Sequence, residues 1–156
     1  MRLLKSILVA VLALAVCSSC GLSKIAQQVE VEGFSKLDLK GMTGLQAAAR
    51  VTNDSRYDIQ MSEAEVTLYH NAKRAVTLTQ VGEAISTAET RADVETLWKI
   101  SGVDPRSISS FVSLLSDREL ENMTISYSAK FSVKGLNKRI SQENVELQKF
   151  MAIFAR

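Results

Sequence analysis

The chain has little from which a catalytic or metal site could be built. It contains one histidine and two cysteines among 156 residues, and a single histidine cannot supply a multi-histidine metal site. It also lacks a glycine-rich phosphate loop, a Gly-x-Ser-x-Gly nucleophile turn and any cluster of histidine, cysteine and carboxylate at ligand spacing. These absences predict a protein that is not an enzyme and that carries no cofactor and no metal.

The first residues have the pattern of an export signal. Arg2 and Lys5 precede an unbroken apolar run over residues 7–16, and small residues follow it. Ten residues of helix span about 15 Å, half of a bilayer core of roughly 30 Å, so the run is too short to remain as a membrane span. The sequence therefore predicts a signal peptide over residues 1–19.

The residues around the expected cleavage site indicate a lipid anchor. Residues 15–21 read Ala-Val-Cys-Ser-Ser-Cys-Gly, which resembles the lipobox of bacterial lipoproteins, where small residues precede a cysteine that is lipidated and becomes the first mature residue. We expect cleavage between Ser19 and Cys20, with the lipid on Cys20. The alternatives are an ordinary signal peptide, a cut next to Cys17, or a Cys17–Cys20 redox pair, which would need a folded strand-to-helix context.

Removal of the signal changes the charge balance. Basic and acidic side chains number 19 and 17 in the whole chain, and Arg2 and Lys5 leave with the signal, so the mature chain has 17 of each. This balance disfavours nucleic acid as a partner. We expect a tether over residues 20–28, one domain over residues 29–152, and a short C-terminal end over residues 153–156.

Beyond the tether the hydrophobic pattern has a period of two. Over residues 124–134 apolar side chains alternate strictly with polar ones, and residues 45–52 and 92–99 alternate in the same way, with Ala92 expected on the apolar face. This pattern is typical of antiparallel strands with one solvated face. The phase slips near Ser62–Glu63 and again between Ile140 and Val145, which predicts β-bulges that could let a long strand serve two sheets.

Two connections and one helix complete the expected organisation. Asn53 to Arg56 form an Asx-turn sequence, and residues 69–73 read as a hairpin connection in which His70 is an exposed turn residue rather than a catalytic base. Asp104 and Pro105 begin a pattern with helical period, which predicts an α-helix over about residues 105–120 that covers an end or edge of the sheets.

The pattern around the Asx-turn resembles the late embryogenesis abundant type 2 family, also called the WHy domain. In that family a strand ends in a Val-x-Asn-Pro-Asn-like turn, and here the matching pieces are Val51, Asn53 to Ser55, Ile59 and residues 66–69, although the proline is absent. The resemblance implies a mainly β fold, an immunoglobulin- or fibronectin III-like antiparallel β-sandwich with one α-helix. It also implies protection under water or membrane stress, without catalytic residues.

Together these observations predict a lipid-anchored protein of the cell envelope with a noncatalytic domain that acts as a stress-protective or interaction module in the periplasm. Its partners would be the membrane, through Cys20, and an envelope protein or lipid, and the chain would be a monomer. Gly21 follows Cys20 where aspartate commonly marks inner-membrane retention, so the outer membrane is favoured. The alternative is a carrier of a lipid or other apolar ligand between the sheets, lined by Trp98, Phe111 and Phe131.

Three further features have a structural interpretation and a functional one. Glu63 and Glu65 are expected on one strand face, either as a carboxylate pair or as a solvated surface. The C-terminal run over residues 150–154 is apolar, and would complete the core or dock onto a partner. A basic strip near the last hairpin is expected to be solvated; it comprises Lys130, Lys134, Lys138 and Arg139.

Overall fold

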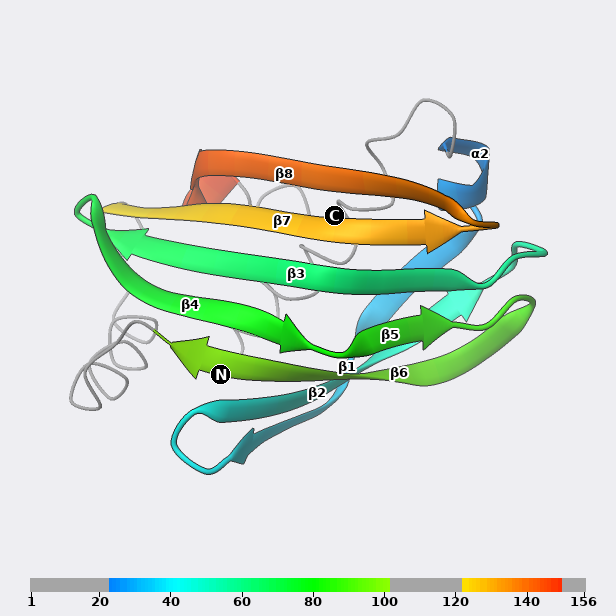
Figure 1. Cartoon of the computed structure of the whole chain (residues 1–156), viewed down its shortest axis with the longest axis horizontal. Coiled ribbons are helices and arrows are strands. Elements are labelled where there is room, and N and C mark those ends of the chain that lie inside the picture. The colour runs from blue at the N-terminus through cyan, green and yellow to red at the C-terminus, as the bar shows by residue number, and fades with distance from the viewer. Residues whose placement is uncertain (1–22, 102–121, 150–156) are drawn as a thin grey trace.

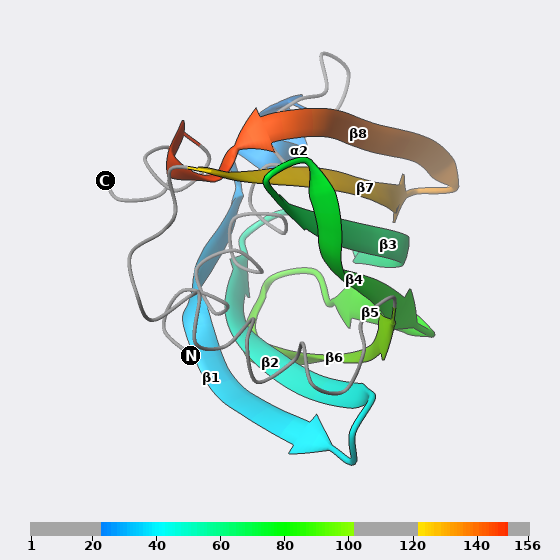
Figure 2. The ribbon, with the colours of Figure 1, turned by 90° about the vertical axis from the view of Figure 1, so that its left-hand side faces the viewer.

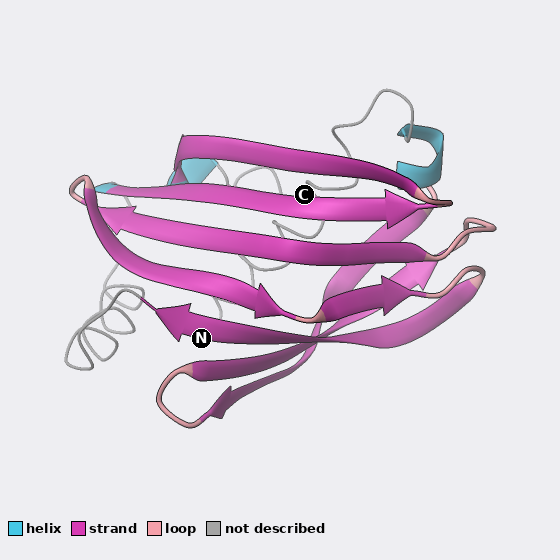
Figure 3. Cartoon of the chain, viewed as in Figure 1, coloured by secondary structure: helices cyan, strands magenta, loops and turns pink. Residues whose placement is uncertain are grey.

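The computed structural model of the chain describes residues 23–101 and 122–149. A short helix is followed by eight strands, coloured along the chain in Figure 1 and by type in Figure 3. The elements are α2 (Ser23–Ala26), β1 (Val29–Lys40), β2 (Gly44–Asn53), β3 (Ile59–His70), β4 (Lys73–Val81), β5 (Glu83–Ser86), β6 (Thr90–Ser101), β7 (Met123–Val133) and β8 (Leu136–Glu146). The expectation of a mainly β, antiparallel fold is confirmed.

The strands form one continuous antiparallel sheet with the order β1-β2-β6-β4-β3-β7-β8. β4 and β5 lie end to end beside β3, because β4 pairs with Glu65–His70 and β5 with Ile59–Ser62. Gly82 separates them with a φ of 77°, a left-handed conformation that glycine adopts without a steric penalty. Figure 2 shows that the sheet curls, so that β1 and β2 lie across the molecule from β7 and β8.

The core lies on the inner side of this curl. β7 alternates buried and half-buried residues along its whole length, as the sequence predicts. Leu45 of β2, Trp98 of β6 and Ile125 of β7 belong to one buried cluster, with exposed fractions of 1%, 2% and 0%. Residues of both edge strands, among them Val29 of β1 and Val145 of β8, pack against the same cluster, so the curled sheet wraps around its core. Ala92, expected on the buried face of β6, is exposed and outside the core cluster, although its register partner Val51 is buried.

Both predicted phase slips are β-bulges. In β3 the pairing with β7 shifts between Ser62 and Glu65, and Glu63 has a φ of 51°. In β8 the pairing with β7 shifts opposite Ile125 and Tyr127, and Asn144 has a φ of 54°. The bulged strands remain in one sheet, so the idea that each kink passes a strand between two separate sheets is wrong for the described strands. The bulges instead add twist, which helps the sheet to curl.

A buried glutamine forms hydrogen bonds with backbone groups at the bulge in β3. Gln80 of β4 is 8% exposed, and its side-chain Nε2 donates to the carbonyl oxygen of Met61 at 3.1 Å while its Oε1 accepts from the backbone N–H of Ala64 at 3.2 Å. A bulge leaves backbone groups without ladder partners, and an unpaired buried group is costly. Gln80 therefore fixes the position of the bulge.

The Asx-turn after β2 is confirmed and is fully buried at its centre. Asn53 is 0% exposed, and its Oδ1 accepts from the Ser55 backbone N–H at 3.1 Å and from the Ser55 hydroxyl at 2.6 Å. Its Nδ2 donates to the carbonyl oxygens of Tyr57 at 3.0 Å and Ser86 at 3.1 Å. One amide thus joins the end of β2, the start of β3 and the end of β5.

The hairpin between β3 and β4 is also confirmed, with φ angles of 50° and 62° at Asn71 and Ala72 that are typical of a two-residue turn. The prediction for His70 needs a correction. His70 ends β3 and is half-buried beside the turn rather than exposed within it, because it is paired with Lys73 across the hairpin.

Part of the expected tether is attached to the domain. Ile25 of α2 packs against the core, and the carbonyl oxygen of Gln28 accepts from the Asp54 N–H at 2.8 Å. The predicted helix over residues 105–120, the signal peptide and residues 150–156 lie outside the described residues.

Candidate functional site

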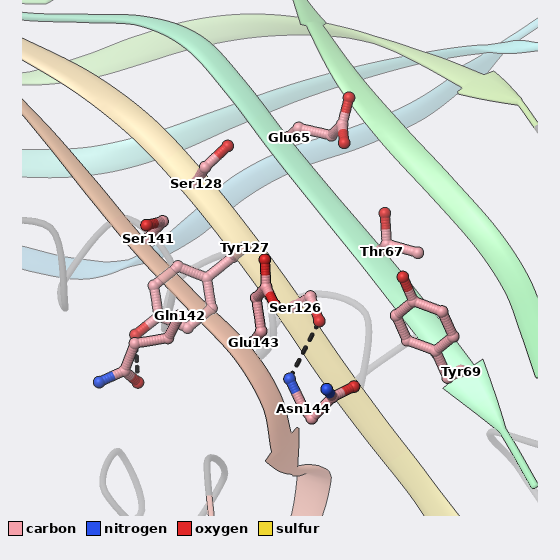
Figure 4. A pocket seen from close by; sticks show the side chains of 10 residues that line it. All are labelled: Glu65, Thr67, Tyr69, Ser126, Tyr127, Ser128, Ser141, Gln142, Glu143 and Asn144. Atoms are coloured by element: carbon pink, nitrogen blue, oxygen red, sulfur yellow. Dashed lines mark hydrogen bonds between the residues drawn. The ribbon is translucent and has the colours of Figure 1, made fainter. Parts of the chain in front are cut away.

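A shallow groove of about 270 Å³ runs over the outer face of the sheet, across β3, β7 and β8 (Figure 4). Its lining is mainly polar, with hydroxyl, carboxylate and amide side chains, and includes the rings of two tyrosines. The lining residues are Glu65, Thr67, Tyr69, Ser126, Tyr127, Ser128, Ser141, Gln142, Glu143 and Asn144. Of these residues the sequence analysis considered only Glu65, as one of a possible carboxylate pair, and it predicted no binding groove.

The groove exists because the middle strand has small side chains on its outer face. Ser126 and Ser128 of β7 lie between longer side chains on the two neighbouring strands, Glu65 and Tyr69 on β3 and Glu143 on β8. Adjacent strands are about 4.8 Å apart, so β3 and β8, which lie on either side of β7, are separated by roughly 10 Å, and this sets the width of the groove. The serines therefore form a floor, and the residues of β3 and β8 form walls.

The register places the groove residues in rows across the sheet. Glu65 pairs with Ser128, and Ser128 pairs with Ser141. Beside this row the β8 bulge turns Asn144 so that its backbone N–H donates to the Ser126 hydroxyl at 3.0 Å. The bulge, which the hydrophobic pattern predicts, is thus also what shapes the β8 wall of the groove.

Two hydrogen bonds, one buried and one part-buried, join strands of the groove to their neighbours. The Thr67 hydroxyl lies 3.1 Å from that of Thr77 on β4. Tyr127 is 5% exposed, and its phenol donates to Oε1 of Gln142 at 2.9 Å. Burial raises the pKa of the Tyr127 phenol, so it remains a hydrogen-bond donor at neutral pH and does not act as a base.

An ion-pair cluster lies beside the serine row. Glu63 contacts Lys130 of β7 at 3.3 Å and also pairs with Arg139 of β8. The hydrogen bond from Lys130, followed by its charge and then by Arg139, lowers the pKa of the Glu63 carboxyl. Two cations of the predicted basic strip, Lys130 and Arg139, are therefore paired with Glu63. A third, Lys134, lies 3.8 Å from the centre of the Tyr57 ring, so the strip is largely engaged in contacts within the domain.

The two carboxylates that were considered as a pair have different surroundings. Glu63 belongs to the ion-pair cluster, whereas Glu65 lines the groove. Glu65 and Glu143 form no salt bridge with other described residues and remain available to accept hydrogen bonds. Among the described residues no group of three or more histidine, cysteine, aspartate and glutamate side chains could hold a metal ion.

The outer face at the other end of the sheet carries bidentate ion pairs. Arg91 of β6 donates to both carboxylate oxygens of Glu32 of β1, at 2.7 and 2.5 Å, and Thr52 donates to Glu32 at 2.6 Å. Arg50 of β2 pairs similarly with Asp93 of β6. The hydrogen bond from Arg91 lowers the pKa of Glu32, and that from Arg50 lowers the pKa of Asp93.

The predicted anchor lies outside the described residues, since neither Cys17 nor Cys20 falls within them. The same is true of Phe111 from the alternative carrier hypothesis. Its other two candidates, Trp98 and Phe131, are core residues that are 2% and 6% exposed. Within residues 23–101 and 122–149, no helix is long and apolar enough to cross a membrane.

Comparison with known proteins gives no family. No family model matches the sequence, and no curated protein matches it. The similar solved structures have low identity. The yeast GGA1_GAE domain-P21 structure is 13% identical, with 74% of this chain and 95% of that chain covered and a TM-score of 0.33.

Two further solved structures are comparable. A protein from Archaeoglobus fulgidus is 8% identical over 73% of this chain and 88% of that chain, with a TM-score of 0.43. The GAE domain of GGA2p from Saccharomyces cerevisiae is 10% identical over 74% of this chain and 86% of that chain, with a TM-score of 0.33. Likenesses at this level carry no inference about the present chain.

Proposed function

We propose that the protein is a noncatalytic binding module of the cell envelope, anchored to a membrane by a lipid on Cys20. The observation that carries the proposal is the groove across β3, β7 and β8, which offers many hydrogen-bonding groups on an open surface. Its hydroxyl groups have no adjacent histidine or lysine base among the lining residues, and the Tyr127 phenol is held as a donor. Such a surface can recognise a ligand without reacting with it.

The position of the expected anchor suits this role. Only two residues separate Cys20 from the start of α2 at Ser23, and α2 is held against the domain through Ile25. A lipid on Cys20 would therefore keep the domain close to the bilayer. Confinement at a surface raises the effective concentration toward envelope partners, so that even a weak site is occupied.

We propose further that the curled sheet is a sandwich of the late embryogenesis abundant type 2 kind. Two observations support it: the ends of the sheet pack over one core, and the Asn53 turn is a buried hydrogen-bonded corner at the place where that family has its turn motif. A stress-protective role follows from the same proposal. The outer membrane is the favoured location.

The sheet edges favour a monomer. β1 and β8 each end the sheet, and both are interrupted by register shifts. Charged side chains stand along β1, and β8 exposes most of its residues, several of them charged. Bulges and charges on an edge strand discourage pairing with a second copy.

The packing of Trp98 and Phe131 in the core gives no specific support to the alternative proposal of a carrier for an apolar ligand.

The lipid anchor is testable by intact-mass analysis of the full chain from the membrane fraction of a bacterial host. We expect a mature chain that starts at Cys20 and carries a diacylglyceryl group, and we expect Cys20→Ala to abolish both processing at this site and lipid incorporation. Cys17→Ala is the matched control and should leave both unchanged. An unmodified Cys20, or a mature start elsewhere, would refute the anchor.

A further inference from the structure

We propose that the groove across β3, β7 and β8 binds a neutral carbohydrate chain. This inference rests on the proposed role as a binding module and adds the ligand class, but it does not depend on the lipid anchor. Three properties of the groove lead to it: the chemistry of its floor, the chemistry of its walls, and its charge.

The floor is built from hydroxyl groups. Ser126 and Ser128 are half-buried on the middle strand, and Ser141 of the β8 wall adds a hydroxyl in the same row as Ser128. A hydroxyl both donates and accepts hydrogen bonds, and so does each hydroxyl of a sugar ring. The small serine side chains also leave space for a ring to approach the strand closely.

The walls add fixed acceptors, donors and an aromatic surface. Glu65 of β3 and Glu143 of β8 are exposed carboxylates on opposite sides of the floor, and Asn144 follows Glu143 on the β8 wall (Figure 4). A carboxylate only accepts hydrogen bonds, so its ligand must donate, as sugar hydroxyls do. The half-buried Tyr69 supplies a ring at one end of the β3 wall, and the apolar C–H face of a sugar packs well on such a ring.

The charge of the site selects against other polymers. The lining contains two carboxylates, Glu65 and Glu143, and no lysine or arginine. The neighbouring cluster of Glu63, Lys130 and Arg139 contributes two positive charges and one negative, so the site and its surroundings sum to −1. A polyanion such as a nucleic acid would be repelled by the lining, and a single negative charge gives a polycation little attraction. A neutral ligand with many hydroxyl groups fits best.

The shape fits part of a long chain rather than a whole small molecule. A volume of about 270 Å³ lies below the range of roughly 300 to 1,000 Å³ that is typical of sites enclosing a small molecule, and the groove is open to solvent. Because exposed hydrogen bonds to sugar compete with water, the affinity should be weak, with a Kd on the order of 1 mM. Attachment at a membrane would make such an affinity sufficient.

The test is a titration of the full chain, labelled with ¹⁵N and held in micelles of a detergent without a sugar headgroup. The probes are three neutral hexasaccharides, from cellulose, amylose and chitin, added to about 10 mM, which is roughly ten times the expected Kd. We expect at least one of them to shift the backbone signals of Ser126, Ser128 and Asn144 in a saturable manner, while signals from β1 and β2 stay unchanged.

The variant Ser128→Leu fills the floor of the groove and should weaken binding at least about tenfold. Ser132→Leu is the matched control, because Ser132 lies on the same face of β7 outside the groove, and it should bind like the unchanged protein. Dispersed spectra of both variants would show that they fold. No groove shifts with any hexasaccharide, groove shifts with spermine alone, or unchanged binding by Ser128→Leu would each overturn the proposal, and none of these results bears on the lipid on Cys20.

Discussion

The outer faces at the two ends of the sheet differ in how their polar groups are used. On β1, β2 and β6, arginines and carboxylates pair with each other in bidentate contacts, as in Glu32 with Arg91 and Arg50 with Asp93. On β3, β7 and β8, small hydroxyl side chains line an open groove whose carboxylates have no salt-bridge partner among the described residues. The polar groups of the first face pair with one another, whereas those of the second line an open groove, which is the proposed binding site.

This difference shows that a polar surface is informative only when its hydrogen-bonding state is known. Both faces alternate polar residues with apolar ones and would look equally solvated in the sequence. Long charged side chains close over the first face: Arg50 meets its register partner Asp93, and Arg91 of β6 reaches across β2 to Glu32 of β1. Serines on the middle strand keep the second face open, because they are too short to reach their neighbours' charged groups.

The largest effect is expected where the two ends of the sheet are joined. Gln80 lies on β4, between β6 and β3, and replacement by methionine would leave the buried Met61 carbonyl and Ala64 N–H without their side-chain partners. We expect Gln80→Met to lower the free energy of unfolding by about 2 kcal/mol or more in urea titrations. The amide hydrogen of Ala64 should also exchange faster with solvent.

Gln60→Met is the matched control for this prediction. Gln60 is half-buried on the neighbouring strand and lies on the outer face of β3, so the same substitution there should change the free energy of unfolding by less than about 0.5 kcal/mol. Equal effects at both positions would mean that the bulge does not depend on Gln80.

Acid should weaken the ion-pair face through its carboxylates. Hydrogen bonds from arginine lower the pKa of Glu32 and of Asp93 below their ordinary values of 4.5 and 3.8. A carboxyl whose pKa is lower in the folded state stabilises the protein fully above its ordinary pKa, and this contribution is lost as pH falls through the folded pKa. We therefore expect the urea midpoint to be constant near neutrality and to fall progressively below about pH 4.5.

Glu32→Gln should lower the urea midpoint at neutral pH and make its loss in acid less steep, because the variant has already lost the charged partner of Arg91. Glu95→Gln, on the outer face of the same β6 strand as Arg91 and without a described salt bridge, should leave the profile unchanged. If the urea midpoint of Glu32→Gln fell with pH in parallel with that of the unchanged protein, the Glu32–Arg91 pair would not be a source of the acid sensitivity.

The smallest effect is expected from two glutamates on β3. Glu63→Gln removes the partner of Lys130 and Arg139 and should lower the thermal midpoint slightly at low salt, with the difference disappearing in high salt. Glu65→Gln removes a carboxylate without a described salt-bridge partner and should not lower it. A larger loss from Glu65→Gln than from Glu63→Gln in differential scanning calorimetry would reverse the roles given to these two residues.

Much of the fold could be predicted because period-two alternation depends only on which residues prefer to be buried. The strict pattern over residues 124–134, the Asx-turn at Asn53 and the slip near Ser62 each follow from local side-chain chemistry. The groove could not be predicted, because it requires knowing that β7 lies between β3 and β8. The serines were visible in the sequence as an ordinary solvated face, and their neighbours were not.

The sequence by itself determined that the chain would be an antiparallel β domain with bulged strands, since burial preference and turn chemistry act over a few residues. Only the tertiary structure decided which polar side chains satisfy one another and which face an open groove. Pairing between strands is nonlocal, so residues as far apart as Glu32 and Arg91, or Glu65 and Ser128, become neighbours only when the sheet forms.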